Sequence, residues 1–150
     1  HAGWKGLLQG VLAQAALNLA QVCKVSCEQI VAWLGPALGP HSFELGIDVQ
    51  HQFEAAWLQA VPLAHMHPHL NPHQLHACFA EHPKDPTKCM GNLYRLAGLS
   101  LAGVGVNQVL GLNPDASLDT LTNLQWFSYR RAGRLGQPSG RFATVVRLLP

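Results

Sequence analysis

Charged residues are scarce in this 150-residue sequence, which has 10 lysines and arginines and 8 aspartates and glutamates. Their formal balance of +2 is too small to indicate a nucleic-acid partner. Because 48% of the residues are apolar and only 12% are charged, the composition excludes a disordered tail. The chain is long enough for one domain with a real core and too short for two comfortable ones.

The sequence also lacks an apolar run of transmembrane length, because Gln, Asn or Pro interrupts each apolar segment. No secretory signal pattern opens it. Its four cysteines are too few for a dense disulfide framework, so reduced thiols in a cytosolic protein are the simpler interpretation. We therefore expect a cytoplasmic protein with no membrane and no nucleic-acid partner.

Apolar periodicity predicts helices and strands that alternate along the chain. Helical spacing, with a proline at one first-turn position, predicts helices at residues 6–22, 48–59, 72–80 and 92–104. Short runs of β-forming residues predict strands at residues 29–34, 42–46, 106–110, 126–130 and 142–149. We expect the first strand to be buried and the last two to form a hairpin. The interleaving indicates a mixed, layered α/β fold without a repeat or a domain boundary.

Neither a Ser nucleophile elbow nor a standard phosphate-binding glycine loop is present. The segment 128–141 instead carries four arginines around a Gly-containing turn. Guanidinium groups match phosphate or carboxylate oxygens in a bidentate manner, so this segment is a candidate anion site. The alternative is a solvated hairpin tip, since charged tips are common.

Nine histidines are the compositional oddity of the chain, and six of them crowd into residues 65–82. His73 and His76, with Cys78 close by, form a candidate metal-binding face. No pair has a defined zinc spacing, and the prolines favour a His-rich surface insertion instead. His41, which follows the second Gly-Pro pair, is a candidate either for a cleft or for a structural hydrogen bond.

Several segments, taken in order, resemble one known family. Residues 1–7 (HAGWKGL) resemble that family's His-Ala-Gly-Trp-Arg-Gly-Leu, and residues 32–46 resemble its double Gly-Pro loop and Phe-Glu-Val-Gly strand. Residues 127–131 (FSYRR) and 140–143 (GRFA) resemble its closing Phe-Ser-Tyr-Arg-Arg and Gly-Arg-Met-Ala segments. On these motifs the chain is similar to the laccase-domain family, also called multicopper polyphenol oxidase-like or peptidoglycan-editing factor proteins.

The resemblance implies a laccase-domain α/β fold, with mixed sheets covered by helices, that acts as a zinc-dependent purine nucleoside phosphorylase. The implied substrates are phosphate and adenosine, inosine, guanosine or methylthioadenosine. Adenosine deamination is implied as a companion activity, and bacterial members are also credited with editing peptidoglycan precursors. The family's metal is held by a histidine, a cysteine and a second histidine, which opens the His-Ala-Gly-Trp motif. His1 is therefore the implied catalytic metal ligand, with zinc as the metal and copper as the alternative.

Departures from the family pattern bear on this site. The family carries its other two ligands in a segment before the motif, so residues 1–150 are expected to be the carboxy-terminal portion of a single laccase domain. A single imidazole does not hold zinc tightly. Lys5 stands where the family has arginine, which removes a bidentate fork, and Asn92 stands where it has aspartate.

We therefore expect a purine nucleoside phosphorylase in which His1 binds the metal. Arg130 and Arg131 are the hypothesis for contact with phosphate or substrate. The alternatives are a non-catalytic His-rich metal-binding module and an inactive fragment that lacks two of the three metal ligands.

Overall fold

A computed structural model describes residues 1–58 and 72–143 of the chain. Within these ranges the helices are α1 (Trp4–Leu8), α2 (Val11–Cys23), α3 (Ile47–Leu58), α4 (Pro72–His76), α5 (Leu93–Ala102) and α6 (Tyr129–Arg134). The strands are β1 (Val31–Trp33), β2 (Glu44–Gly46), β3 (Phe79–Glu81), β4 (Lys88–Gly91) and β5 (Gln108–Leu110). Strands β1 and β5 pair in parallel, whereas β2, β4 and β3 form an antiparallel sheet in that order. The predicted mixture of helices and strands is confirmed.

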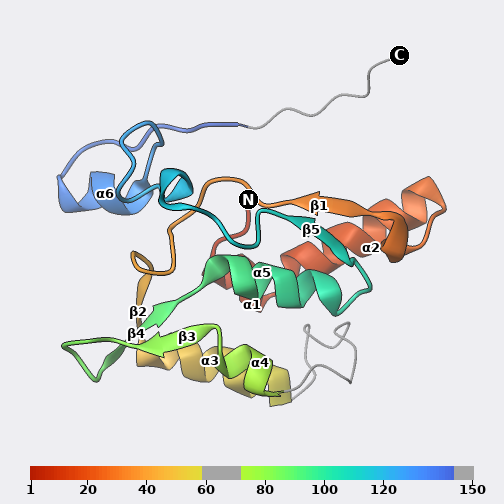
Figure 1. Ribbon diagram of the computed structural model, residues 1–150, viewed down its shortest axis with the longest axis horizontal. Coiled ribbons are helices and arrows are strands. Elements are labelled where there is room, and N and C mark those ends of the chain that lie inside the picture. The colour runs from red at the N-terminus through yellow and green to blue at the C-terminus, as the bar shows by residue number, and fades with distance from the viewer. Residues whose placement is uncertain (59–71, 144–150) are drawn as a thin grey trace.

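Helix α5 organises the described core. Figure 1 shows it between the β1–β5 pair and the β2–β4–β3 sheet. Leu96 and Ala97 belong to a large apolar cluster that includes residues of β2, α3 and β4, while Leu101 belongs to a smaller cluster with Val106. One helix therefore joins the two parts of the core.

The helix predicted over residues 6–22 is interrupted in the structure. Gly10 adopts a left-handed conformation with φ 75°, and this turn separates α1 from α2. Glycine adopts this conformation at little steric cost because it has no Cβ. The helices predicted at 48–59 and 92–104 are confirmed as α3 and α5 within a few residues. Asn92 is the N-cap of α5, and its side-chain oxygen accepts the N–H of Arg95 at 3.0 Å.

The strand predicted at residues 29–34 is present as β1, but the expectation that it is buried is wrong. Val31 is 55% exposed and Trp33 is 52% exposed, because the described structure places a second strand beside β1 but does not cover both faces of the pair. The strands predicted at 42–46 and 106–110 are confirmed as β2 and β5. The helix predicted at residues 72–80 ends at His76 as α4, and its last residues lie in β3 instead. Strand β4 was not predicted, since both strands are too short for periodicity and lie in a proline-rich region.

The hairpin predicted for the end of the chain is wrong where the structure describes it. Residues 126–130 are not a strand, because Ser128 is the N-cap of α6 and its hydroxyl accepts the N–H of Arg131. Phe142 lies in no strand, and residues 144–149 lie outside the described ranges. Figure 1 shows α6 at one end of the molecule, apart from both sheets. No helix in the described ranges is long and apolar enough to cross a membrane.

Replacing Gly111 with alanine is expected to destabilise the protein, because this residue closes the β1–β5 pair. Its φ is +83°, and an added Cβ would lie 2.6 Å from the carbonyl oxygen of Leu34. We expect the free energy of unfolding to fall by about 2 kcal/mol or more, measured by denaturant titration. Gly136→Ala is the matched control, with φ +63° and nothing within 4 Å of the added Cβ, and should cost about 1 kcal/mol. Equal losses in the two variants would show that the contact with Leu34 contributes nothing.

Candidate active site

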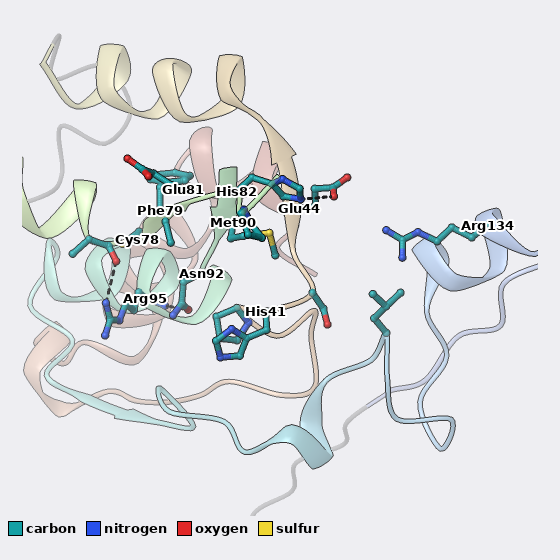
Figure 2. A pocket seen from close by; sticks show the side chains of 16 residues that line it. His41, Glu44, Cys78, Phe79, Glu81, His82, Met90, Asn92, Arg95 and Arg134 are labelled. Atoms are coloured by element: carbon teal, nitrogen blue, oxygen red, sulfur yellow. Dashed lines mark hydrogen bonds and ion pairs between the residues drawn. The ribbon is translucent and has the colours of Figure 1, made fainter. Parts of the chain in front are cut away.

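A cavity of about 670 Å³ lies between the antiparallel sheet, the loop before β2 and the end of α6. This volume suits a small organic ligand. Figure 2 shows the side chains that line it. Its polar lining residues include His41, Glu44, His82, Asn92, Arg95 and Arg134.

Glu44 is the most highly connected of these side chains. One carboxylate oxygen lies 3.0 Å from Lys88 Nζ and the other lies 3.1 Å from His82 Nε2. The hydrogen bond from Lys88 outweighs the effect of burial and lowers the pKa of Glu44, with further help from the charge of Lys88 and from His82. Because β2 places Glu44 directly opposite β4, the sheet holds a carboxylate that is ionised at neutral pH at the cavity wall.

His82 supports Glu44 and is not itself free to act as a base. Its Nδ1 accepts the backbone N–H of Lys84 at 3.3 Å, so Nε2 carries the proton that points to Glu44. Figure 2 shows the ring directed at the carboxylate. Both ring nitrogens are engaged, and the role of His82 is to fix the position of Glu44.

The two arginines predicted to contact substrate have different environments. Arg130 donates to the backbone carbonyl of Glu44 at 2.7 Å and lies over the ring of Phe43, 5.3 Å from its centroid. Burial lowers the pKa of Arg130, and the nearby charge of Arg134 adds to this effect. Arg130 therefore contacts the strand that carries Glu44 but does not line the cavity.

Arg131 is committed to the backbone of the preceding loop. Its guanidinium donates to the carbonyls of Thr120 at 2.8 Å, Leu121 at 3.1 Å and Asn123 at 3.2 Å, and also to that of Trp126. These hydrogen bonds draw the carbonyls of one loop toward a single guanidinium, and they leave it little capacity for a bound anion. Its predicted role in substrate binding stays a prediction.

Asp119 fixes the same loop from its other side. Its carboxylate accepts the hydroxyl of Ser42 at 2.5 Å and the N–H of Leu121 at 2.8 Å. Burial raises the pKa of Asp119, but hydrogen bonds from Ser42 and from the backbone outweigh it and lower the pKa below its ordinary value of 3.8. The loop before β2 and the loop before α6 are thereby joined beside the cavity.

His1, the predicted metal ligand, is exposed and does not line this cavity. Across residues 1–58 and 72–143, no three His, Cys, Asp or Glu side chains are grouped as a metal site. In the face formed by His73, His76 and Cys78, burial raises the pKa of the Cys78 thiol to about 12, and this thiol donates to the backbone carbonyl of Gln74. His65, His67 and His69 lie outside the described residues.

The sequence did not single out Glu44, His82, Arg95 and Arg134 as parts of one site. They come from four separate segments, and only the pairing of β2, β3 and β4 brings Glu44 and His82 together. Two signals were available: the position of Glu44 in the Phe-Glu-Leu-Gly motif and the position of Arg134 in the arginine segment 128–141. His41, a candidate for a cleft or for a structural hydrogen bond, does line the cavity.

Comparison with known proteins supports the family resemblance. Residues 1–149 match the model of the multi-copper polyphenol oxidoreductase laccase family. The chain is 35% identical over 152 residues to a purine nucleoside phosphorylase of Pseudomonas aeruginosa, covering 99% of this chain and 50% of that protein. It is 34% identical to the purine nucleoside phosphorylase YfiH of Escherichia coli (99% and 49% covered) and 31% identical to a purine nucleoside phosphorylase of Haemophilus influenzae (97% and 49% covered). The chain thus spans about half the length of these relatives.

Asp119→Asn should destabilise the protein at neutral pH, because it removes the charged carboxylate that accepts hydrogen bonds from the Ser42 hydroxyl and the Leu121 N–H. We expect a loss of about 1–3 kcal/mol at pH 7 in urea unfolding, and a smaller loss for Ser42→Ala. Because folding lowers the pKa of Asp119, its carboxylate stabilises the folded protein above pH 3.8, and this stabilisation is lost as the pH falls through the folded-state pKa. The difference in free energy of unfolding between the wild type and Asp119→Asn should therefore become smaller below about pH 4. A difference in free energy of unfolding that stays constant down to pH 3 would show that the Asp119 charge does not stabilise the folded protein.

Proposed function

Since this chain belongs to the multi-copper polyphenol oxidoreductase laccase family, we propose that it forms part of an enzyme that cleaves purine nucleosides with phosphate. Support comes from the relatives, which are named purine nucleoside phosphorylases. The cavity is the feature of this chain that supports the proposal, because it is lined both by the fixed Glu44 carboxylate and by the Arg134 guanidinium. A cavity with both charges suits two substrates, a neutral nucleoside that donates hydrogen bonds to the carboxylate and a phosphate that binds the guanidinium.

The proposed reaction is a displacement at the anomeric carbon of the ribose. An oxygen of phosphate forms a bond to C1′ while the bond from C1′ to the purine N9 breaks, and its electron pair stays on the base. The base takes up a proton from solvent or from hydrogen phosphate, so the products are ribose 1-phosphate and the free purine. Arg130 contributes by holding the backbone carbonyl of Glu44, and we retain it with Arg131 as a proposed contact for phosphate or substrate.

Zinc is part of the proposal, but the described residues do not form a zinc site on their own. His1 would supply one imidazole, and the remaining ligands would come from residues outside the described ranges. Bound zinc would supply Lewis acidity, with copper as the alternative metal. The grounds for zinc are the match between residues 1–7 and the family motif.

The family resemblance extends the proposal in two further directions. Adenosine deamination is proposed as a companion activity, and editing of peptidoglycan precursors as an additional one, in a cytoplasmic protein. A competing proposal is a non-catalytic metal-binding module built on the histidines of residues 65–82. Loss of zinc binding on deletion of residues 65–76, with nucleoside turnover retained, would assign these histidines to a separate site.

The protein is expected to convert adenosine to adenine only when phosphate is present. The measurement is chromatographic detection of adenine and ribose 1-phosphate in phosphate and in phosphate-free buffer. Arg130→Ala should lower kcat/KM about tenfold or more, because it frees the Glu44 segment from a charged hydrogen bond. Phosphate-independent release of adenine would contradict a phosphorylase, and an unchanged phosphate dependence in Arg130→Ala would remove the role of Arg130.

Substitution of His1 should reduce the metal content of the purified protein. We expect His1→Ala to lose most of the bound zinc, measured by elemental analysis after dialysis, because a zinc site with three protein ligands tolerates poorly the loss of one. His51→Ala is the control, since His51 is exposed on α3. Equal zinc in wild type and His1→Ala would exclude His1 as a ligand.

A further inference from the structure

The four arginines of residues 128–141 are not equivalent in the structure. Arg130 and Arg131 donate to backbone carbonyls, and Arg141 lies 3.5 Å from the carbonyl of Ser139. In the described part of the chain no hydrogen bond or ion pair engages the Arg134 guanidinium. Arg134 is also the one of the four that lines the cavity, and its side chain is exposed.

Arg134 and Glu44 approach the cavity from different elements. Figure 2 shows the Arg134 side chain extending from α6 toward the side where Glu44 lies on β2. No ion pair joins them in the described structure, where Glu44 pairs with His82 and Lys88 instead. The cavity therefore has an acceptor at one position and an unused bidentate donor at another.

Glu44 keeps part of its hydrogen-bonding capacity for a ligand. A carboxylate offers about four lone-pair positions, and the contacts with Lys88 and His82 take one on each oxygen. The side chain is 33% exposed, so the remaining position on each oxygen is open to a pair of neighbouring hydroxyl groups. Because the donors come from β4 and from the residue after β3, the carboxylate is fixed before any ligand arrives.

We propose that Glu44 and Arg134 form a ribose-and-phosphate subsite, in which the carboxylate accepts the 2′ and 3′ hydroxyls of a ribonucleoside and the guanidinium binds phosphate. The proposal deepens the proposed function and rests on it. The opposite charges of Glu44 and Arg134 also set the orientation of the substrates. Phosphate is repelled by the Glu44 carboxylate and attracted by Arg134, whereas neutral hydroxyls are suitable donors to Glu44.

The sugar half of the subsite is tested by the preference for ribose over deoxyribose. In the full-length protein we expect kcat/KM to be at least about tenfold higher for adenosine than for 2′-deoxyadenosine, because the 2′ hydroxyl donates to a charged acceptor. Glu44→Gln should reduce this ratio about tenfold, toward unity. Glu28→Gln makes the same change on an exposed residue outside the cavity and should leave the ratio unchanged.

The phosphate half is tested separately. Arg134→Ala should raise the KM for phosphate about tenfold and leave the ratio of adenosine to deoxyadenosine unchanged. Arg134→Lys should recover part of the loss, because lysine restores charge without the bidentate fork. Arg141→Ala is the control from the same segment and should leave the phosphate KM as it is.

The outcomes separate this proposal from the function on which it rests. A wild-type protein without phosphate-dependent turnover would overturn both. Turnover with an unchanged sugar ratio in Glu44→Gln, or an unchanged phosphate KM in Arg134→Ala, would overturn the subsite alone. If Glu44→Gln lowers the melting temperature enough to prevent assay, Glu44→Asp serves instead. Aspartate keeps the charge but withdraws it by one methylene, so an unchanged ratio in that variant counts against the proposal.

Discussion

Polar contacts hold residues 111–143 to the rest of the described chain. In the described ranges every buried apolar residue lies at or before Val106, and the buried residues after it are Asp119, Thr120 and Ser128. Asp119 accepts donors from the loop before β2, and Arg131 draws together four backbone carbonyls of residues 120–126. Because a hydrogen bond weakens when its donor and acceptor are misaligned, these contacts fix the position of the segment more closely than apolar contacts do.

The polar attachment of residues 111–143 also determines where the cavity lies. Strand β2 belongs to the apolar core through Leu45, yet the backbone carbonyl of Glu44 accepts a hydrogen bond from Arg130 at the start of α6. The wall formed by β2 and the wall formed by α6 are thus connected at one residue. The Glu44 carboxylate then receives donors from Lys88 on β4 and from His82 just after β3. The candidate site lies where the apolar core meets the polar contacts that attach residues 111–143.

Long amphipathic helices and the mixed class followed from the sequence, because helical periodicity over ten or more residues reports local packing directly. Helix α6 was mistaken for a strand because residues 126–130 are rich in aromatic β-formers, and the N-cap role of Ser128 outweighs that preference. Strands β3 and β4 depend on pairing with β2, a non-local contact that no short window of sequence contains. Strand β1 was predicted to be buried, but its burial depends on which other segments pack against it. The hydrophobicity of the strand itself does not specify those segments.

The candidate site was predictable only in part. The motif positions of Arg130 and Arg131 directed attention to the correct segment, but the bonding of each guanidinium depends on carbonyls from distant residues. Glu44 and His82 are far apart in sequence, so their contact becomes visible only when the sheet forms. The metal-binding role of His1 stays a prediction, because no three His, Cys, Asp or Glu side chains of the described residues are grouped as a metal site.

The decisive experiment is a crystal structure of the full-length protein with bound ribose 1-phosphate, the proposed product. We predict that the two ribose hydroxyls lie within hydrogen-bond distance of the Glu44 carboxylate and that the phosphate lies against the Arg134 guanidinium. Density for the sugar phosphate elsewhere, with neither Glu44 nor Arg134 in contact with it, would contradict the assignment of this cavity as the substrate site.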